Sequence, residues 1–452
     1  MTRAPKQLSL FDATLLVMGG IIGVGIFFKP AGVAALLPEP GPYFGMWILG
    51  TLAALAGAMT FAELAGTLPR SGGWFVFIHK GFGPLAAFLF AWIVLLVIST
   101  GACAGVADFC AQQWWKLLAP DHTPSFVERR GLAGALIVGV SACAWRGMRS
   151  GILLQNLCML AKLVALAVFI IAGLALFEGP SQQPLPSITP TAPLAGRMVS
   201  ATLPVLFTFG GWQLITYIAP HVKDAPRNLP RAIIMGVVGV SVIYLALNAA
   251  YVRVLGLGGV AASANAPAEL ARITLGAKGE AFLTAAMGVS ALGFLVATLV
   301  TTPGIYVAMA RMGLFFQGAG KVHPASGAPR VALAIQASLC CVYLWVSEDV
   351  IGRLGDSVVF AEWIFHGLTG LALLRLRRLR PDLPRPFRSP LYPLFPVAYA
   401  LMAAGVVFGN LRTSEWKVTG LGLVVLAAGA LVYIPWRRMF AGETAHKGEG
   451  SE

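Results

Sequence analysis

The stretch GGIIGVGIF (residues 19–27) puts four glycines into nine residues, in the middle of an apolar segment that runs from about 12 to 34. A second apolar segment, 195–220, carries FTFGGW (207–212) at a similar depth. Glycine costs about 1 kcal/mol relative to alanine inside a helix, and it adopts backbone angles that other residues avoid. Both segments are therefore predicted to be helices that are interrupted near their middle.

The rest of the chain is also apolar. Of its 452 residues, 57% are hydrophobic and 12% are charged, and the mean hydropathy is +0.77. Soluble domains carry about 25% charged residues, so this composition excludes a disordered protein, a disulfide-rich secreted module and an ordinary cytosolic enzyme. A membrane-crossing helix needs about 20 apolar residues. Twelve segments are read as such helices, at about 12–34, 41–67, 82–113, 130–146, 151–177, 195–220, 231–256, 280–311, 329–347, 355–375, 391–411 and 418–437. We therefore predict an all-α polytopic membrane protein with twelve transmembrane helices.

Basic residues are unevenly distributed among the predicted loops. The net charge is +14, but these residues lie in short loops between apolar segments, so we expect contact with the lipid bilayer and no nucleic-acid partner. With a cytoplasmic N-terminus, 21 of the 33 Lys and Arg residues fall on the cytoplasmic side, including Arg3 and Lys6. This bias predicts a multi-pass protein of the plasma (cytoplasmic) membrane with both termini in the cytoplasm. No cleavable signal peptide is expected.

The two interruptions fall in the first and the sixth predicted spans. Interrupted helices at matching positions in two halves of a chain point to the central site of a transporter. The halves are then a first repeat over 1–177 and a second, inverted repeat over 195–375, followed by two further helices over 391–437, all within one transport domain. Gly19 and Gly23 also form a GxxxG pair, which alone would let two helices pack closely.

An interrupted membrane helix frees backbone groups that need polar partners. Free N–H groups at the start of a half-helix suit a carboxylate, and free carbonyls suit an ammonium group. One site that offers both matches a zwitterionic amino acid. The sequence shows no constellation of catalytic side chains and no set of metal ligands, so we expect neither an enzyme nor a cofactor or metal site.

Charged residues inside the predicted spans are the remaining candidates. Lys162 lies near the middle of the fifth span, where a lysine costs about 2.5–3.5 kcal/mol on insertion scales and is functional by default. A structural role as a partner for carbonyls is the alternative. Glu362 lies in the outer half of the tenth span and is a possible cavity acid. Glu63 and Asp108 are expected to be boundary residues.

Several segments resemble the amino acid–polyamine–organocation superfamily, and most closely its L-type amino acid transporter branch. They are GGIIGVGIFFKP (19–30), AELAGTLPRSGGWFVFIHKGFGPLAAF (62–88), QNLCMLAKLVALA (155–167), FTFGGWQLITYIAPHVKDAPRNLPRAI (207–233), TPGIYVAMARMGLF (302–315) and EWIFHGLTGLALLRLRRLRPDLPRPFRSPLYP (362–393). The resemblance implies a LeuT-type fold: twelve helices, a 5+5 inverted repeat with broken helices 1 and 6, and alternating access between the two membrane faces.

The resemblance also assigns roles around the two interruptions. It implies that the substrate carboxylate meets the backbone N–H groups of Val24 and Gly25, with Gly23 in the same turn. The substrate ammonium group would meet carbonyls near Ile21 and Phe207, and the Phe207 ring would close over the substrate as a gate.

Three further residues receive roles in the same way. Gly210 would leave room for the substrate side chain, and Trp212 would support the unwound turn. Lys162 matches the lysine that stands where sodium-coupled relatives bind an ion and that links span 1 to span 8, which implies transport without sodium. The outer loop 114–130 lacks the cysteine by which some animal relatives bind a glycoprotein, so we expect no disulfide-linked ancillary subunit.

The sequence departs from the family at two positions: Val24 replaces a small hydroxyl residue, and His221 replaces an acid. The leading expectation is a sodium-independent secondary transporter of neutral L-amino acids that works by exchange. The open alternatives are a proton-coupled symporter, a polyamine or cationic amino acid carrier that uses Glu362, and a membrane sensor or channel.

Overall fold

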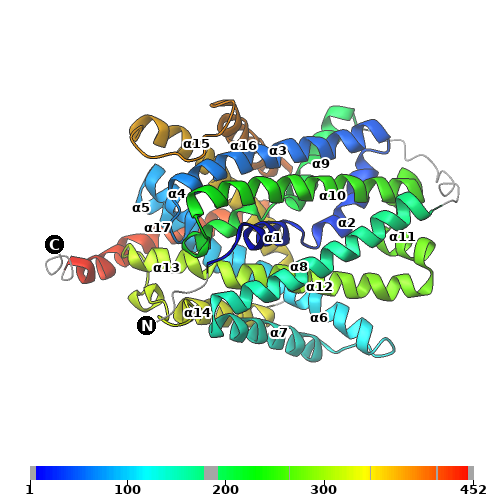
Figure 1. Ribbon diagram of the computed structural model, residues 1–452, viewed down its shortest axis with the longest axis horizontal. Helices are drawn as coiled ribbons and strands as arrows, with labels where there is room; N and C mark the ends of the chain where they lie inside the picture. The colour runs from blue at the N-terminus through cyan, green and yellow to red at the C-terminus, as the bar shows by residue number, and fades with distance from the viewer. Residues whose placement is uncertain (1–6, 178–191, 264, 347, 414–415, 446–452) are drawn as a thin grey trace.

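The computed structural model describes most of the chain, namely residues 7–177, 192–263, 265–346, 348–413 and 416–445 (Figure 1). Within these ranges the regular elements are helices, and the β-type pairing is a single bridge between Leu8 and Val222. The described chain is thus all-helical, as its composition predicts. Arg3 and Lys6, which count toward the predicted cytoplasmic charge, lie outside the described residues.

Each predicted span contains helix. In chain order the helices are α1 (Leu10–Ile21) with α2 (Gly25–Leu36), α3 (Pro40–Thr67), α5 (Pro84–Ile93) with η1 (Val94–Ile98) and α6 (Ser99–Leu118), α7 (Phe126–Arg146), α8 (Met148–Ile171) with η2 (Ala172–Leu176), α9 (Leu194–Thr208) with η3 (Trp212–His221), α10 (Ala225–Ala262), α12 (Ala277–Thr301) with α13 (Pro303–Arg311), α14 (Arg330–Leu344), α15 (Glu348–Leu379), α16 (Leu394–Thr413) and α17 (Trp416–Ala445). Shorter helices between the spans are α4 (Gly73–Phe82), α11 (Ala266–Leu275) and η4 (Gln317–Gly320).

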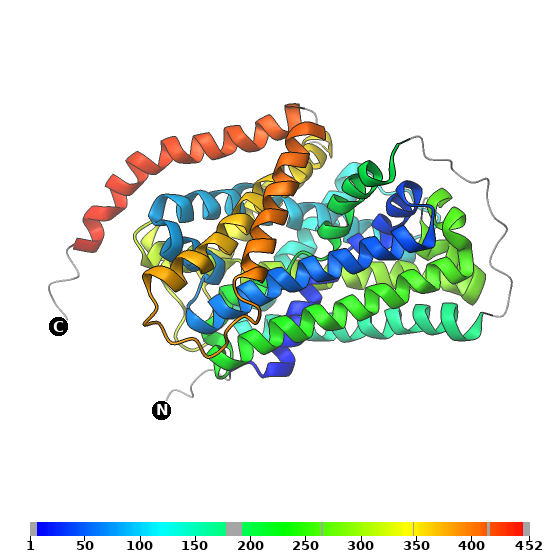
Figure 2. The same ribbon diagram turned by 90° about the horizontal axis from the view of Figure 1, so that it is seen from above.

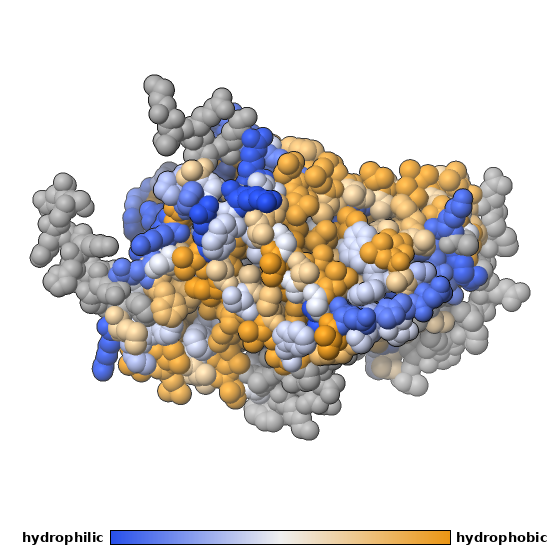
Figure 3. Space-filling model, turned by 90° about the horizontal axis from the view of Figure 1, so that it is seen from below, coloured by the Kyte–Doolittle hydropathy of each residue, from blue (hydrophilic) through white to orange (hydrophobic). Residues whose placement is uncertain are grey.

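The helices are suited to a bilayer. Seven of the described helices are long and apolar enough to cross a membrane, and the bent pair of α1 and α2 makes eight. The chain is therefore a multi-pass membrane protein, while the total of twelve spans stays a prediction. Figure 3 shows that apolar residues cover most of one face of the molecule and that hydrophilic residues gather toward its two ends.

The long helices form the body of the bundle. Helices α3 and α10 run side by side along the long axis, and α1 packs against α10 near the centre (Figures 1 and 2). Helix α17 lies on the outside of the bundle and ends beyond it (Figure 2). The end of the molecule at which α17 ends is called the α17 end below.

Both predicted interruptions are breaks in helix. Helix α1 begins at a capping box of Ser9 and Asp12 and ends at Ile21, and α2 begins at Gly25 with its axis turned by 45°. Helix α9 ends at Thr208, and the chain resumes as the 3-10 helix η3 at Trp212. Each break leaves about three residues without regular helix, in the middle of the bundle.

Candidate functional site

The two breaks lie against each other, backbone to backbone. A Cβ added to Gly20 would lie 2.7 Å from the carbonyl oxygen of Gly211, and one added to Gly211 would lie 2.2 Å from the carbonyl oxygen of Gly20. Gly211 also has a φ of +115°, which side chains disfavour. Glycine at these two positions is therefore required by the crossing of the two chains.

Gly19 and Gly23 differ in their surroundings. A Cβ on Gly19 would lie 2.1 Å from Nε2 of Gln155 on α8, so this glycine serves close helix packing. A Cβ on Gly23 would meet only the Phe294 ring, at 3.7 Å. The packing interpretation of the GxxxG pair thus holds for Gly19 and does not account for Gly23.

Tyr244 of α10 joins the two breaks. Its hydroxyl lies 3.2 Å from the carbonyl oxygen of Ile21 and 3.0 Å from that of Thr208, the last residues of α1 and α9. The Ile21 carbonyl also accepts the N–H of Gly23, at 2.8 Å. Both lone pairs of this carbonyl are therefore engaged, so Ile21 is a weaker acceptor for a substrate ammonium group than its place in the sequence indicates. Tyr244 was not singled out by the sequence, because an isolated tyrosine in an apolar helix carries no signal.

Lys162 lies between the first break and α12. Its side chain is 1% exposed, and its Nζ donates to the carbonyl of Ile22. Gly293 of α12 faces it, since a Cβ there would lie 3.7 Å from Nζ. Ser290 of α12 donates to the carbonyl of Gly23, at 3.4 Å. Helices α8 and α12 thus hold two successive carbonyls of the break.

The start of α2 is available for an anion. Val24 is the N-cap residue and its side chain makes no capping hydrogen bond, so the N–H groups of Gly25 and Ile26 have no partner in the preceding turn. The ring of Phe207 lies beside them, 3.5 Å from the position of a Cβ on Gly25. The positive end of α2 therefore faces the last turn of α9.

The end of α9 supplies the opposite charge. None of the described hydrogen bonds outside helices uses the carbonyl of Phe207, and a Cβ on Gly210 would meet only that oxygen, at 3.8 Å. The C-terminal end of a helix carries partial negative charge. Free space, a free carbonyl and the start of α2 therefore occur together at the two breaks.

The Phe207 side chain is 48% exposed, although it lies in an apolar helix. The Nζ of Lys29, one turn into α2, lies 5.2 Å from the centre of its ring. An ammonium group at that distance is attracted to the face of the ring. Lys29 was not selected from the sequence, since its partner lies far away in the chain.

Trp212 and Glu362 lie next to the second break, the one between α9 and η3. Trp212 is buried, and its ring centre lies 5.9 Å from that of His366. Gln213 accepts the N–H of Gly211 at 3.0 Å and donates to the Glu362 carboxylate at 3.2 Å. Glu362 therefore supports the unwound turn through Gln213, and this contact occupies one of the oxygens that a cationic substrate would need.

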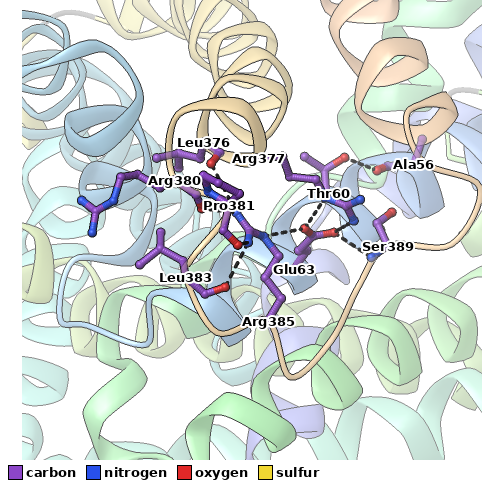
Figure 4. A network of polar contacts seen from close by, with 10 residues as sticks. All are labelled: Ala56, Thr60, Glu63, Leu376, Arg377, Arg380, Pro381, Leu383, Arg385 and Ser389. Atoms are coloured by element: carbon purple, nitrogen blue, oxygen red, sulfur yellow. Dashed lines mark hydrogen bonds and ion pairs between the residues drawn. The ribbon is translucent and has the colours of Figure 1, made fainter.

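Glu63 is not a boundary residue, which corrects the sequence expectation. It is 0% exposed and accepts from Arg377 Nε at 2.7 Å, from Arg377 Nη2 at 2.5 Å and from the N–H of Ser389 at 2.7 Å. Arg385 lies 3.6 Å away (Figure 4). This Glu63 cluster ties α3 to the end of α15 and to the loop after it. Asp108 likewise forms a bridge, 3.0 Å from Arg129 of α7.

The described residues contain no group of three or more His, Cys, Asp or Glu side chains that could hold a metal ion. The six cysteines are free, and four of them are buried. The site therefore consists of backbone groups, one lysine, hydroxyl groups and aromatic rings. Such groups can form hydrogen bonds with a polar solute.

Comparison with known proteins also indicates a transport protein. The family model described as "Amino acid permease" matches residues 8–430. The chain is 30% identical over 434 residues to "Large neutral amino acids transporter small subunit 2" of Mus musculus, covering 95% of this chain and 80% of that protein. It is 29% identical to "b(0,+)-type amino acid transporter 1" of Mus musculus, covering 96% and 88% of the two chains. It is 26% identical to "Serine/threonine exchanger SteT" of Bacillus subtilis (strain 168), covering 95% and 96%.

Proposed function

Because the chain belongs to the amino acid permease family, in the L-type branch of the amino acid–polyamine–organocation superfamily, it is a membrane transporter and not an enzyme, and we propose that it exchanges neutral L-amino acids without sodium. Of the relatives, one is named as a transporter of large neutral amino acids, one as a b(0,+)-type amino acid transporter and one as an exchanger of serine and threonine. The proposal extends these substrates and this mode of transport to the present chain.

The observation that carries the proposal is the pairing of opposite helix ends at the two breaks. The N–H groups of Val24 and Gly25, together with that of Ile26, have no partner among the described backbone hydrogen bonds and would bind the substrate carboxylate. The free carbonyl of Phe207 would accept the substrate ammonium group. The open space at Gly210, where a Cβ would meet no charged side chain within 4 Å, would take an uncharged substrate side chain. Val24 and Gly23 would line the same turn.

The sodium independence that we propose rests on Lys162. An ammonium group that donates to the Ile22 carbonyl puts a positive charge beside the carbonyls that would otherwise attract a metal cation. A sodium ion in the same place would be repelled. The same lysine would keep α1 and α12 together during the transport cycle.

The mechanism that we propose is alternating access in a LeuT-type fold. Residues 1–177 would form one repeat and 195–375 an inverted second one, with α16 and α17 outside the repeats. Twelve spans would place both termini in the cytoplasm, in accord with the loop charges. Since the chain has no cysteine between α6 and α7, we also propose that it works without a disulfide-linked subunit.

Counterflow in proteoliposomes tests the substrate and the mode of transport. Vesicles are loaded with one amino acid or polyamine, and the same labelled compound is supplied outside in sodium-free buffer. We expect neutral amino acids to accumulate without any ion gradient. Uptake that requires an inward proton gradient would refute exchange and favour symport. Accumulation of polyamines alone would refute the substrate class.

A matched pair of variants tests the site. Gly25→Leu puts a side chain against the Phe207 ring, whereas Gly32→Leu lies in the same helix with nothing within 4 Å of its Cβ. We expect Gly25→Leu to abolish substrate binding and Gly32→Leu to retain it, with similar melting temperatures. Normal binding by a folded Gly25→Leu protein would exclude the proposed site.

A further inference from the structure

A cavity lies at the α17 end of the bundle, and none of its lining residues belongs to the two breaks. Its volume is about 620 Å³, and its walls come from α5, η1, α7, α13 with the segment after it, α14 and α17. Large aromatic side chains dominate the lining, namely Phe88, Trp92, Trp145, Phe315, Phe316 and Trp436. Figure 1 shows α5, α13 and α17 together at this end of the molecule.

The lining of this groove is almost wholly apolar. Ser338 is the one hydroxyl residue among the side chains that form it, and none of them is charged. The indole N–H of Trp436 is engaged by the carbonyl of Leu314, at 3.0 Å, so the ring presents its apolar atoms. Pockets for small ligands span about 300–1,000 Å³, and 620 Å³ lies within that range. The groove is suited to a hydrocarbon chain and not to an amino acid.

One arginine lies at the edge of the groove, and two more lie next to its lining residues in the chain. The guanidinium group of Arg330 lies 5.7 Å from the ring centre of Trp145, one of the lining residues. Its Nε is buried and forms no hydrogen bond among the described residues. Arg146 and Arg437 directly follow two lining tryptophans in the chain, and both are exposed. Within the described part of the chain, none of these three arginines forms an ion pair.

An apolar groove with an arginine at its edge matches the structure of a phospholipid. Basic pockets between transmembrane helices on the cytoplasmic side bind anionic lipid headgroups. A phospholipid carries a phosphate directly above its acyl chains, which is the order that Arg330 and the groove present. A sterol would fill the apolar part but would leave the arginines unpartnered.

We propose that this groove binds one acyl chain of an anionic phospholipid, whose phosphate is held by Arg330, while Arg146 and Arg437 add positive charge at the same end of the bundle. The lipid comes from the leaflet at the α17 end, which is the cytoplasmic leaflet if both termini are cytoplasmic. The bound chain fills the space between α5, α14 and α17, and so ties the outermost helix to the bundle.

Native mass spectrometry of the purified, delipidated protein tests this proposal. The probes are phosphatidylglycerol and phosphatidylcholine with identical acyl chains. We expect the wild type to retain phosphatidylglycerol preferentially. Arg330→Gln should weaken that retention about fivefold, the factor that one basic residue contributes at an anionic surface. Arg272→Gln, which changes an exposed arginine on α11, should leave the retention unchanged.

A second variant tests the groove itself. Ala334→Phe fills the cavity from α14 and should reduce the retention of both lipids, while counterflow of a folded variant persists. Equal retention of the two lipids by the wild type would overturn the proposal, and so would retention that neither Arg330→Gln nor Ala334→Phe changes. Preferential binding of a sterol would overturn it as well. Because lipid retention and counterflow are separate readouts, failure here is distinguishable from failure of the proposed transport function.

Discussion

Replacing Glu63 with leucine should strongly destabilise the protein. Glu63 lies at the end of α3 and is 0% exposed. Its carboxylate accepts two hydrogen bonds from Arg377, of 2.7 and 2.5 Å, and one of 2.7 Å from the N–H of Ser389. Arg385 approaches to 3.6 Å. A leucine would fill a similar volume but would leave all of these donors without their acceptor.

The expected loss of stability follows from the arginine charges that Glu63→Leu would leave without a partner. Breaking a buried ion pair by removing one partner costs about 3–5 kcal/mol, because an uncompensated charge stays behind. The Arg377 side chain is 20% exposed and that of Arg385 is 8% exposed. Arg377 also lies over the Tyr392 ring, 3.7 Å from its centre, and can reach water. We therefore expect a loss near the lower limit, about 3 kcal/mol.

Thermal unfolding in detergent, followed by tryptophan fluorescence, measures this loss. Asp382→Leu is the control, since it breaks an ion pair in which both side chains are more than half exposed and which contributes little. We expect Glu63→Leu to lower the melting temperature clearly and Asp382→Leu to leave it nearly unchanged. Glu63→Gln keeps one acceptor and should fall between them. Equal melting temperatures for Glu63→Leu and Asp382→Leu would refute the reasoning.

Three further changes test the site. Lys162→Met removes the hydrogen bond that the Lys162 ammonium group donates, and such bonds contribute about 1.5–3 kcal/mol. The variant should therefore slow counterflow at least tenfold. An unchanged rate would show that the Lys162–Ile22 contact is dispensable. Gly20→Val forces a side chain against the Gly211 carbonyl and should lower the free energy of unfolding by about 1–3 kcal/mol through overpacking. Gly45→Val is the control, because a Cβ there has no atom within 4 Å, and it should keep the melting temperature of the wild type. Equal melting temperatures of the two variants would contradict the close crossing of the two breaks. Phe207→Ala should weaken apparent substrate affinity several-fold with little change in melting temperature, because the ring is half exposed; unaltered affinity would exclude a gate role.

The pattern of apolar residues and glycines along the chain was sufficient to predict features that depend only on neighbouring residues. Apolar segments of about 20 residues must form helices in a bilayer, because no water satisfies their backbone groups. The glycines at 19–27 and 207–212 lower helix stability wherever they occur. The helical segments and the two breaks could therefore be predicted, and the family could be recognised from motifs that surround those breaks.

Contacts between residues that are distant in the chain could not be predicted from such local patterns. Glu63 and Arg377 are 314 residues apart, and their pairing depends on how α3 and α15 pack. Tyr244 and Gln213 look like ordinary members of apolar helices until the breaks bring carbonyls and N–H groups to them. The same is true of Lys29, which lies over a ring contributed by α9.

The sequence by itself determined that the chain is helical, that it resides in a membrane, and that two of its helices are broken. These properties follow from hydropathy and from glycine, which act within a few residues of the chain. Only the tertiary structure decided which backbone groups at the breaks stay free and which are engaged. Tyr244, Lys162 and Ser290 take three carbonyls of the first break, and hydrogen bonds of this kind depend on distances between helices that no local pattern specifies.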